Sequence, residues 1–502
     1  MIAQKTPGFG RRSYNYRRSA LIASPYSGQR LQVSRHIRTT LFFVLLFALA
    51  GCSLLEPQPE LVIPTPLPTA PPLESFAEGE VIIDPVSDVV PTVDGNIQAL
   101  LAAVSQQQLM AYVRTLENFG TRNAFSDTQS ETFGIGAARR WIFNEFVRVG
   151  NGRLQVEFQD FPLTYAGKSA QQSNVIARLP GVGTGNGVII VMAHYDTRPV
   201  DATDGVSRST GANDNGSGIA LLLETARIMS SREWNQTVIF LATSAEEQET
   251  AGSRFFAENA FLDGMNILGV INLDAIGGRA GIPQHVRMFA DQYMQSPAGA
   301  LARYFDYVGG LYMPTFPIVI NDALDREGRY GDHREFVKLG FPAIRIIESQ
   351  EDPELLNSNL DTWDRIDYTY LQQVTQLTLA ALANLAGAPH QPSPPTVATM
   401  AEPGSYLLSW AVAPDAAGYA IAFRPVGSPD YPTFRFVKAE RAGNVVLTGL
   451  DPNQTYLVSL AALSQSGLIS GFSTELQVGP PVAAAAPAEG EPAGQQAGGP
   501  EG

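Results

Sequence analysis

Six side chains that could bind a metal ion, or assist its chemistry, lie mostly where apolar runs of the sequence end. In chain order they are His194, Asp196, Asp214, Glu246, Glu247 and Asp274. Imidazole and carboxylate groups are ligands that Zn²⁺ and similar divalent ions take in proteins. A neighbouring carboxylate can also take a proton from water that the ion activates. The set therefore has the chemistry of a hydrolytic metal centre.

Each of these signals has an ordinary explanation when it is taken alone. A Glu-Glu pair such as 246–247 is common at the start of a solvated helix, and the Asn-Asp-Asn of 213–215 is typical of turns. Because several such signals coincide at the ends of apolar runs, the metal centre is favoured. A serine hydrolase is disfavoured, because the Gly-Ser-Gly of 216–218 lacks the G-x-S-x-G nucleophile elbow.

The elements expected to position these groups are buried strands of one sheet. Residues 188–192, 237–243 and 267–273 are apolar and rich in β-branched side chains, as in strands buried on both faces. Helical patterns alternate with these runs, which indicates an α/β fold with a mostly parallel, mixed sheet and helices on both faces. In such sheets the carboxyl ends of parallel strands meet at one edge, where ligands bind. We therefore expect the six groups to gather at that edge.

Four motifs in fixed order resemble those of the M28 family of zinc aminopeptidases, namely HYD, GANDNGSG, SAEEQ and INLD. The resemblance covers about residues 99–385. It implies a fold like that of the zinc exopeptidases, with two Zn²⁺ ions in the active site. Mn²⁺ or Co²⁺ could occupy such an oxygen-rich site as well.

The resemblance also implies a role for each member of the set. His194 and Asp274 would each bind one ion, and Asp214 would bridge both. Glu247 would bind the ion opposite Asp274, while Glu246 would be the general base.

Four further assignments come from the same resemblance. Asp196 would orient a ligand from the second shell of the site, and Asp332 and His333 match a family segment that lines the substrate pocket. Asp361 stands where the family has the histidine that is its fifth ligand. We predict that Asp361 is a ligand, because a carboxylate binds zinc at much the same distance as imidazole. His333 or His285, after rearrangement, remain the alternatives.

Residues 1–52 are typical of an export signal. Arginines precede the apolar run 41–49, which ends in Leu-Ala-Gly before Cys52, the only cysteine of the chain. A run of this length is too short to span a bilayer comfortably. The arrangement resembles a bacterial lipoprotein signal and predicts a lipid on Cys52. The protein would then be exported and anchored to the outer or periplasmic side of a membrane.

Composition divides the rest of the chain. Residues 53–94 are rich in proline and indicate an extended linker before the predicted metallopeptidase domain, 95–388. Short strand patterns with no helical period cover 389–479 and predict a small all-β sandwich. Its Trp410, Tyr419 and Tyr456 resemble those of a fibronectin type III domain, whose partner would be a polymer or a cell-surface component. Residues 480–502 have the composition of a disordered tail.

The predicted function is a metal-dependent exopeptidase, most simply an aminopeptidase that acts on peptide substrates. A carboxypeptidase or a glutaminyl cyclase on the same fold remains an alternative, as does a non-catalytic surface protein with a degenerate site. The complete HYD motif argues against a one-zinc cyclase, and retention of both Glu246 and Glu247 argues against lost catalysis. The formal net charge of −15 makes nucleic acid an unfavourable partner.

Overall fold

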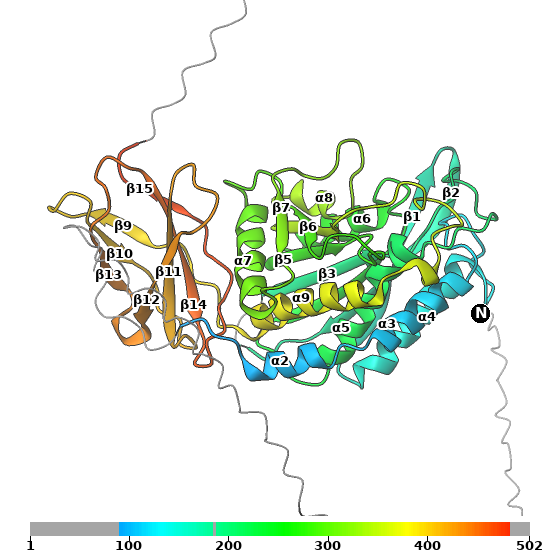
Figure 1. Cartoon of the computed structure of the whole chain (residues 1–502), viewed down its shortest axis with the longest axis horizontal. Coiled ribbons are helices and arrows are strands. Elements are labelled where there is room, and N and C mark those ends of the chain that lie inside the picture. Colours follow the sequence, from blue (N-terminus) through cyan, green and yellow to red (C-terminus); the bar gives the residue numbers. More distant parts are fainter. Residues whose placement is uncertain (1–89, 184–186, 482–502) are drawn as a thin grey trace, which may run out of the picture. The chain divides into compact units, whose positions relative to one another are not determined.

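The computed structural model describes residues 90–183 and 187–481 of the chain (Figure 1). The predicted signal segment, Cys52 and nearly all of the predicted linker lie outside these residues, as does the tail from 482 onward. Within the described part of the chain, no helix combines the length and the apolar composition that crossing a membrane requires.

The core of the first domain is an eight-stranded mixed sheet in the order β1-β2-β4-β3-β5-β8-β6-β7. Its strands are β1 Gln155–Tyr165, β2 Lys168–Leu179, β3 Val188–His194, β4 Thr237–Thr243, β5 Ile267–Leu273, β6 Val286–Phe289, β7 Ile318–Asn321 and β8 Ala343–Glu348. The central strands β4, β3, β5 and β8 run parallel to one another. The antiparallel pairs β1–β2, β2–β4 and β6–β8 and the parallel pair β6–β7 complete the sheet. The predicted mostly parallel mixed sheet is confirmed.

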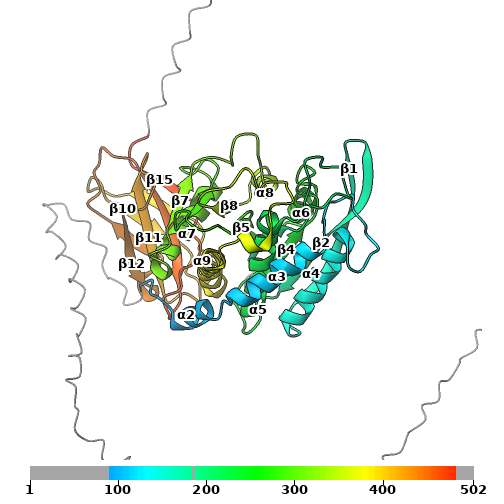
Figure 2. The ribbon, with the colours of Figure 1, turned by 45° about the vertical axis from the view of Figure 1, so that its right-hand side comes forward.

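Helices cover both faces of the sheet (Figure 2). They are α2 Gly95–Ala102, α3 Gln106–Asn118, α4 Gly134–Gly150, α5 Gly218–Met229, α6 Ala251–Leu262, α7 Pro297–Tyr312, α8 His333–Val337 and α9 Tyr368–Gly387. Successive side chains of a strand point to opposite faces. In β3, Ile189 and Val191 therefore pack with α5 and α9, whereas Ile190 and Met192 pack toward α6 and α8. This double burial explains why β3 is apolar throughout.

A small all-β region follows the last helix, as predicted. It has a three-stranded antiparallel sheet, β13-β10-β9, and a four-stranded one, β12-β11-β14-β15. The strands are β9 Thr396–Thr399, β10 Tyr406–Ser409, β11 Gly418–Pro425, β12 Thr433–Lys438, β13 Asn444–Leu447, β14 Tyr456–Leu463 and β15 Leu476–Val478. Trp410 and Tyr419 lie in its hydrophobic core, and the Tyr456 hydroxyl accepts a hydrogen bond from the Asp451 backbone N–H. The fibronectin type III assignment itself stays a prediction.

Candidate metal centre

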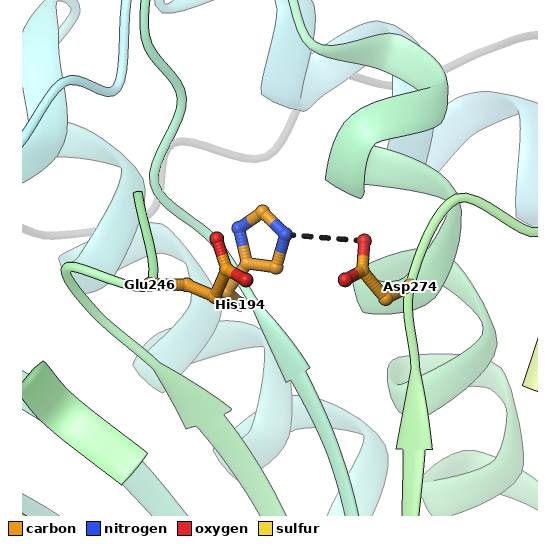
Figure 3. Close-up of side chains that lie close together, drawn as sticks. All are labelled: His194, Glu246 and Asp274. Atoms are coloured by element: carbon orange, nitrogen blue, oxygen red, sulfur yellow. Dashed lines mark hydrogen bonds and ion pairs between the residues drawn. The ribbon is translucent and has the colours of Figure 1, made fainter. Parts of the chain in front are cut away.

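Three of the predicted site residues converge at the carboxyl edge of the parallel strands. His194 is the last residue of β3, Asp274 directly follows β5, and Glu246 comes three residues after β4. Because β4, β3 and β5 are adjacent and parallel, these side chains point toward one another (Figure 3). One ligand atom from each lies within 4.8 Å of the others, and His194 Nε2 is 3.4 Å from Asp274 Oδ1. The geometry suits a shared cation.

Asp214 reaches the same group from the loop between β3 and α5. Its Oδ1 lies 3.2 Å from His194 Nε2. The loop is held from behind by Asp361, whose two carboxylate oxygens accept the backbone N–H groups of Asn213 at 2.7 Å and Asp214 at 2.9 Å. Asp361 is therefore close to the site, but the contacts that the structure shows for its carboxylate are to the loop backbone. Its predicted role as a ligand stays a prediction.

Asp196 connects the histidine to the glutamate pair. Its Oδ1 accepts the backbone N–H of Glu246 and its Oδ2 that of Glu247, both at 3.1 Å. His194 Nδ1 lies 3.6 Å from Asp196 Oδ1 and 3.2 Å from the Asp196 backbone oxygen. With its proton on Nδ1, His194 leaves Nε2 free to bind a metal ion. Asp196 thus touches the groups that its predicted orienting role requires.

The predicted second-ion ligand Glu247 has protein partners on both oxygens. Arg198 donates from Nε to Glu247 Oε2 at 2.6 Å. When the Asn357 amide is oriented to satisfy both neighbours, its nitrogen donates to Oε1 at 3.1 Å and its oxygen accepts from Arg198 Nη2 at 2.9 Å. Arg198 and Asn357 were not predicted from the sequence. Neither residue follows a strand, and no pattern marks them as partners of Glu247.

A buried arginine adjoins the other side of the cluster and was also missed. Arg345 in β8 forms an ion pair through Nη2 with Asp274 Oδ2 at 2.9 Å and donates a hydrogen bond through Nη1 to Asp325 Oδ2 at 2.6 Å. Asp274 Oδ1 is left facing His194. A signal existed in the sequence, because a charged residue inside the apolar run 341–347 must find an opposite charge when it is buried.

The cluster is buried, and its carboxylates shift one another's protonation. Burial raises the pKa of Glu246 well above its ordinary value, and repulsion from Asp274 and Glu247 adds to the shift. Burial lowers the pKa of His194, but the facing carboxylates, Glu246 foremost, raise it to well above its usual range. Burial would raise the pKa of Asp274, yet the Arg345 guanidinium, His194 and Arg326 together outweigh this effect and hold that pKa well below its ordinary value. Concentrated negative charge of this kind favours a bound cation.

An open pocket of about 570 Å³ lies over the cluster. The acidic residues in its wall are Asp201, Asp214, Glu246, Glu247, Glu249 and Asp274. Arg198, Tyr330 and Arg334 also face it. The pocket therefore gives a substrate direct access to the predicted base and ligands.

The predicted substrate-binding residues Asp332 and His333 do not line this pocket. Both are buried, and the described residues that line the pocket do not include them. Asp332 Oδ2 accepts a hydrogen bond from Thr243, and His333 Nε2 donates to the backbone oxygen of Leu324 at 2.6 Å. Of this segment, Tyr330 and Arg334 line the pocket, and the substrate-binding role of Asp332 and His333 stays a prediction.

His333 gives the protein a pH-dependent stability. Burial lowers its pKa to about 4, below the ordinary value of 6.5. Between these values the unfolded chain binds a proton that the folded chain does not. The free energy of unfolding therefore falls as the pH falls from about 6.5 toward 4, by at most about 1.4 kcal/mol per pH unit from this group. We expect His333→Gln to lose less stability than the wild type between pH 7 and 4.5 in urea unfolding.

Identical pH dependence in wild type and His333→Gln would show that His333 titrates alike in the folded and unfolded chains.

Comparison with known proteins agrees with this chemistry. The model of peptidase family M28 matches residues 174–382. A relative from Pyricularia oryzae named "Probable zinc metalloprotease" is 32% identical over 389 residues, which cover 68% of this chain and 78% of that protein. A second probable zinc metalloprotease, from Leptosphaeria maculans, is 33% identical over 303 residues, which cover 55% of this chain and 70% of the relative.

Solved structures are more distant. LapB from Legionella pneumophila has a TM-score of 0.49 at 21% identity and covers 60% of this chain and 78% of its own. A glutaminyl cyclase from Porphyromonas gingivalis has a TM-score of 0.46 at 22% identity. The match covers 56% of this chain and 98% of the cyclase. From the family match and the Pyricularia relative, the chain belongs to peptidase family M28 and is a zinc metallopeptidase.

Proposed function

We propose that the chain is an aminopeptidase that removes N-terminal residues from peptides. The observation that carries this proposal is the convergence of His194, Glu246 and Asp274 beneath an open pocket. Five arginines (Arg198, Arg326, Arg329, Arg334 and Arg345) line the same pocket, and Asp201 and Glu249 are its acidic residues outside the predicted metal site. These two carboxylates are the proposed partners of the ammonium group of a free peptide N-terminus.

The residues present fit one zinc ion. His194, Asp214 and Asp274 would hold it, because Nε2 of His194 faces an oxygen of each carboxylate at 3.2 and 3.4 Å. One imidazole and two carboxylates are a usual donor set for zinc, and Mn²⁺ or Co²⁺ would also accept it. When bound, the ion polarises the substrate carbonyl and lowers the pKa of water.

Side chains of the protein would transfer the proton of the attacking water. Glu246 lines the pocket and is the proposed base, which accepts a proton from the attacking water and passes it to the leaving amine. Asp196 fixes the backbone of Glu246 and Glu247 through two hydrogen bonds, so the base is held in place beside the ligands. The second ion predicted from the sequence would need Glu247 and Asp361, and the measured ratio of zinc to protein decides that prediction.

The test is an assay on matched peptides. We expect cleavage of a tripeptide with a free amino terminus, with or without an amidated carboxyl terminus, and none of its N-acetylated form. Removal of zinc by a chelator should abolish the activity, and added zinc should restore it. Cleavage of the N-acetylated peptide from its carboxyl end would indicate a carboxypeptidase, and ammonia release from an N-terminal glutamine would indicate a cyclase. No turnover of any peptide by zinc-loaded protein would support the non-catalytic alternative.

We also propose that the protein is exported and held by a lipid on Cys52 at the outer or periplasmic side of the membrane. The proposal is supported by the basic and apolar pattern of residues 1–52. Cys52→Ser should move the protein from the membrane fraction to the soluble fraction. A protein that stays membrane-bound after this change would contradict it. The all-β region would contact a polymer or cell-surface partner, which is proposed by analogy of fold alone.

A further inference from the structure

The two carboxylates predicted for a second metal ion are both bound to other groups of the protein. Glu247 is almost buried, with a side chain 10% exposed, and its oxygens accept hydrogen bonds from Arg198 and Asn357. Asp361 is 3% exposed, and its oxygens accept the backbone N–H groups of Asn213 and Asp214. In both carboxylates each oxygen thus already has a donor from the protein, whereas Oδ1 of Asp214 and Oδ1 of Asp274 face His194.

Within residues 90–183 and 187–481, no second imidazole joins the cluster of His194, Glu246 and Asp274. Of the histidines that the structure describes, His194 alone belongs to the cluster. His333 directs Nε2 to the backbone of Leu324. The His390 ring pairs with Asp415 in the segment after α9.

Arg198 places a permanent positive charge beside Glu247, where the second ion was predicted. A guanidinium stays protonated at all pH values at which the protein is folded, and its planar N–H groups match a carboxylate. Its Nε lies 2.6 Å from Glu247, and its side chain faces the pocket. A divalent cation on Glu247 would have to displace this guanidinium from Oε2 or compete with Asn357 for Oε1 beside a like charge. Asp274 differs, because Arg345 pairs with Oδ2 and leaves Oδ1 facing His194.

We infer that this member of the family holds a single divalent ion, on His194, Asp214 and Asp274, and that Arg198 takes the place of a second ion as the cation bound to Glu247. The inference rests on the proposed metal centre. Within it, Asp361 is a positioning residue for the loop that carries Asp214. The substrate would then meet one metal ion and one guanidinium in the pocket instead of two metal ions.

The number of bound ions tests this inference directly. The full-length chain is stripped with a chelator and titrated with zinc chloride, and bound zinc is measured by plasma mass spectrometry after gel filtration. We expect one zinc per chain in the wild type and none in His194→Ala at the same free zinc concentration. Arg198→Met should bind a second, weaker zinc ion, because it frees Glu247 and removes the competing charge.

The matched control is Arg208→Met. Arg208 lies in the same β3–α5 loop and pairs with Glu117 at 3.1 Å, but it does not contribute to the described lining of the pocket. This variant should keep one zinc per chain.

Two outcomes would overturn the inference. Two tightly bound zinc ions in the wild type would do so whether or not Arg198→Met folds, and so would a folded Arg198→Met that still binds only one ion. Activity measurements separate this result from the proposed function. One ion without peptidase activity would refute the aminopeptidase proposal alone, whereas an active peptidase with two ions would refute the one-ion inference alone.

Discussion

Glu246→Gln lowers the turnover number on a peptide substrate by about 10²- to 10⁴-fold and leaves zinc content and fold unchanged, if Glu246 is the general base. Glutamine preserves the shape of the side chain and the backbone N–H that Asp196 accepts, so only proton transfer is lost. The size of the loss follows from the contribution that a positioned base makes to hydrolysis. Steady-state kinetics on the free-amine tripeptide, with zinc analysis of the same sample, measures it.

The control is Glu258→Gln, which changes an exposed glutamate of α6 and should keep the wild-type turnover number. Near-normal turnover in Glu246→Gln with zinc retained would move the role of base to another group. Loss of zinc in Glu246→Gln would instead make Glu246 a ligand, an arrangement compatible with its place within 4.8 Å of the His194 and Asp274 ligand atoms.

Substitution of Asp361 is expected to weaken zinc binding strongly. Asp361→Ala removes the acceptor of two backbone N–H groups, those of Asn213 and Asp214. Each buried N–H left without a partner costs about 1–3 kcal/mol. The loop should therefore shift, displace Asp214 from His194, and weaken zinc binding by about 10- to 100-fold with a parallel loss of activity. Competition with a chromophoric chelator measures the affinity.

Two substitutions at this position separate a positioning role from a ligand role. Asp361→Asn keeps one acceptor oxygen and should give an intermediate zinc affinity. Asp361→His cannot accept both N–H groups and should bind zinc no better than Asp361→Ala. Recovery of a second zinc ion in Asp361→His would favour the ligand prediction made from the sequence. Asp364→Ala, which changes an exposed carboxylate nearby, should behave as wild type.

The buried core of the sheet could be predicted because its sequence signal is local. The predicted runs 188–192, 237–243 and 267–273 correspond to β3, β4 and β5 within a few residues. A strand covered on both faces must be apolar along its whole length, so composition alone reveals it. The sequence signal is weaker in the β1–β2 hairpin, because most of β1 and the first residues of β2 are at least partly exposed. The four-residue strands β6 and β7 gave no recognisable pattern.

The same reasoning determined part of the site from the sequence. His194, Glu246 and Asp274 follow strands that were themselves predictable, and parallel strands end at a common edge of the sheet. Their convergence therefore follows from topology. Asp214 was predicted from the loop that follows β3, and the structure places it 3.2 Å from His194. The family resemblance added its bridging role, which stays a prediction.

Only the tertiary structure decided what the remaining charges do. Arg198 pairs with a residue 49 positions away, and Asp361 accepts hydrogen bonds from backbone groups 147 and 148 positions away. An aspartate that binds a metal ion cannot be distinguished in a sequence from an aspartate that accepts backbone N–H groups. The difference lies in which donors reach the two oxygens, and that depends on how distant loops pack over the edge of the sheet.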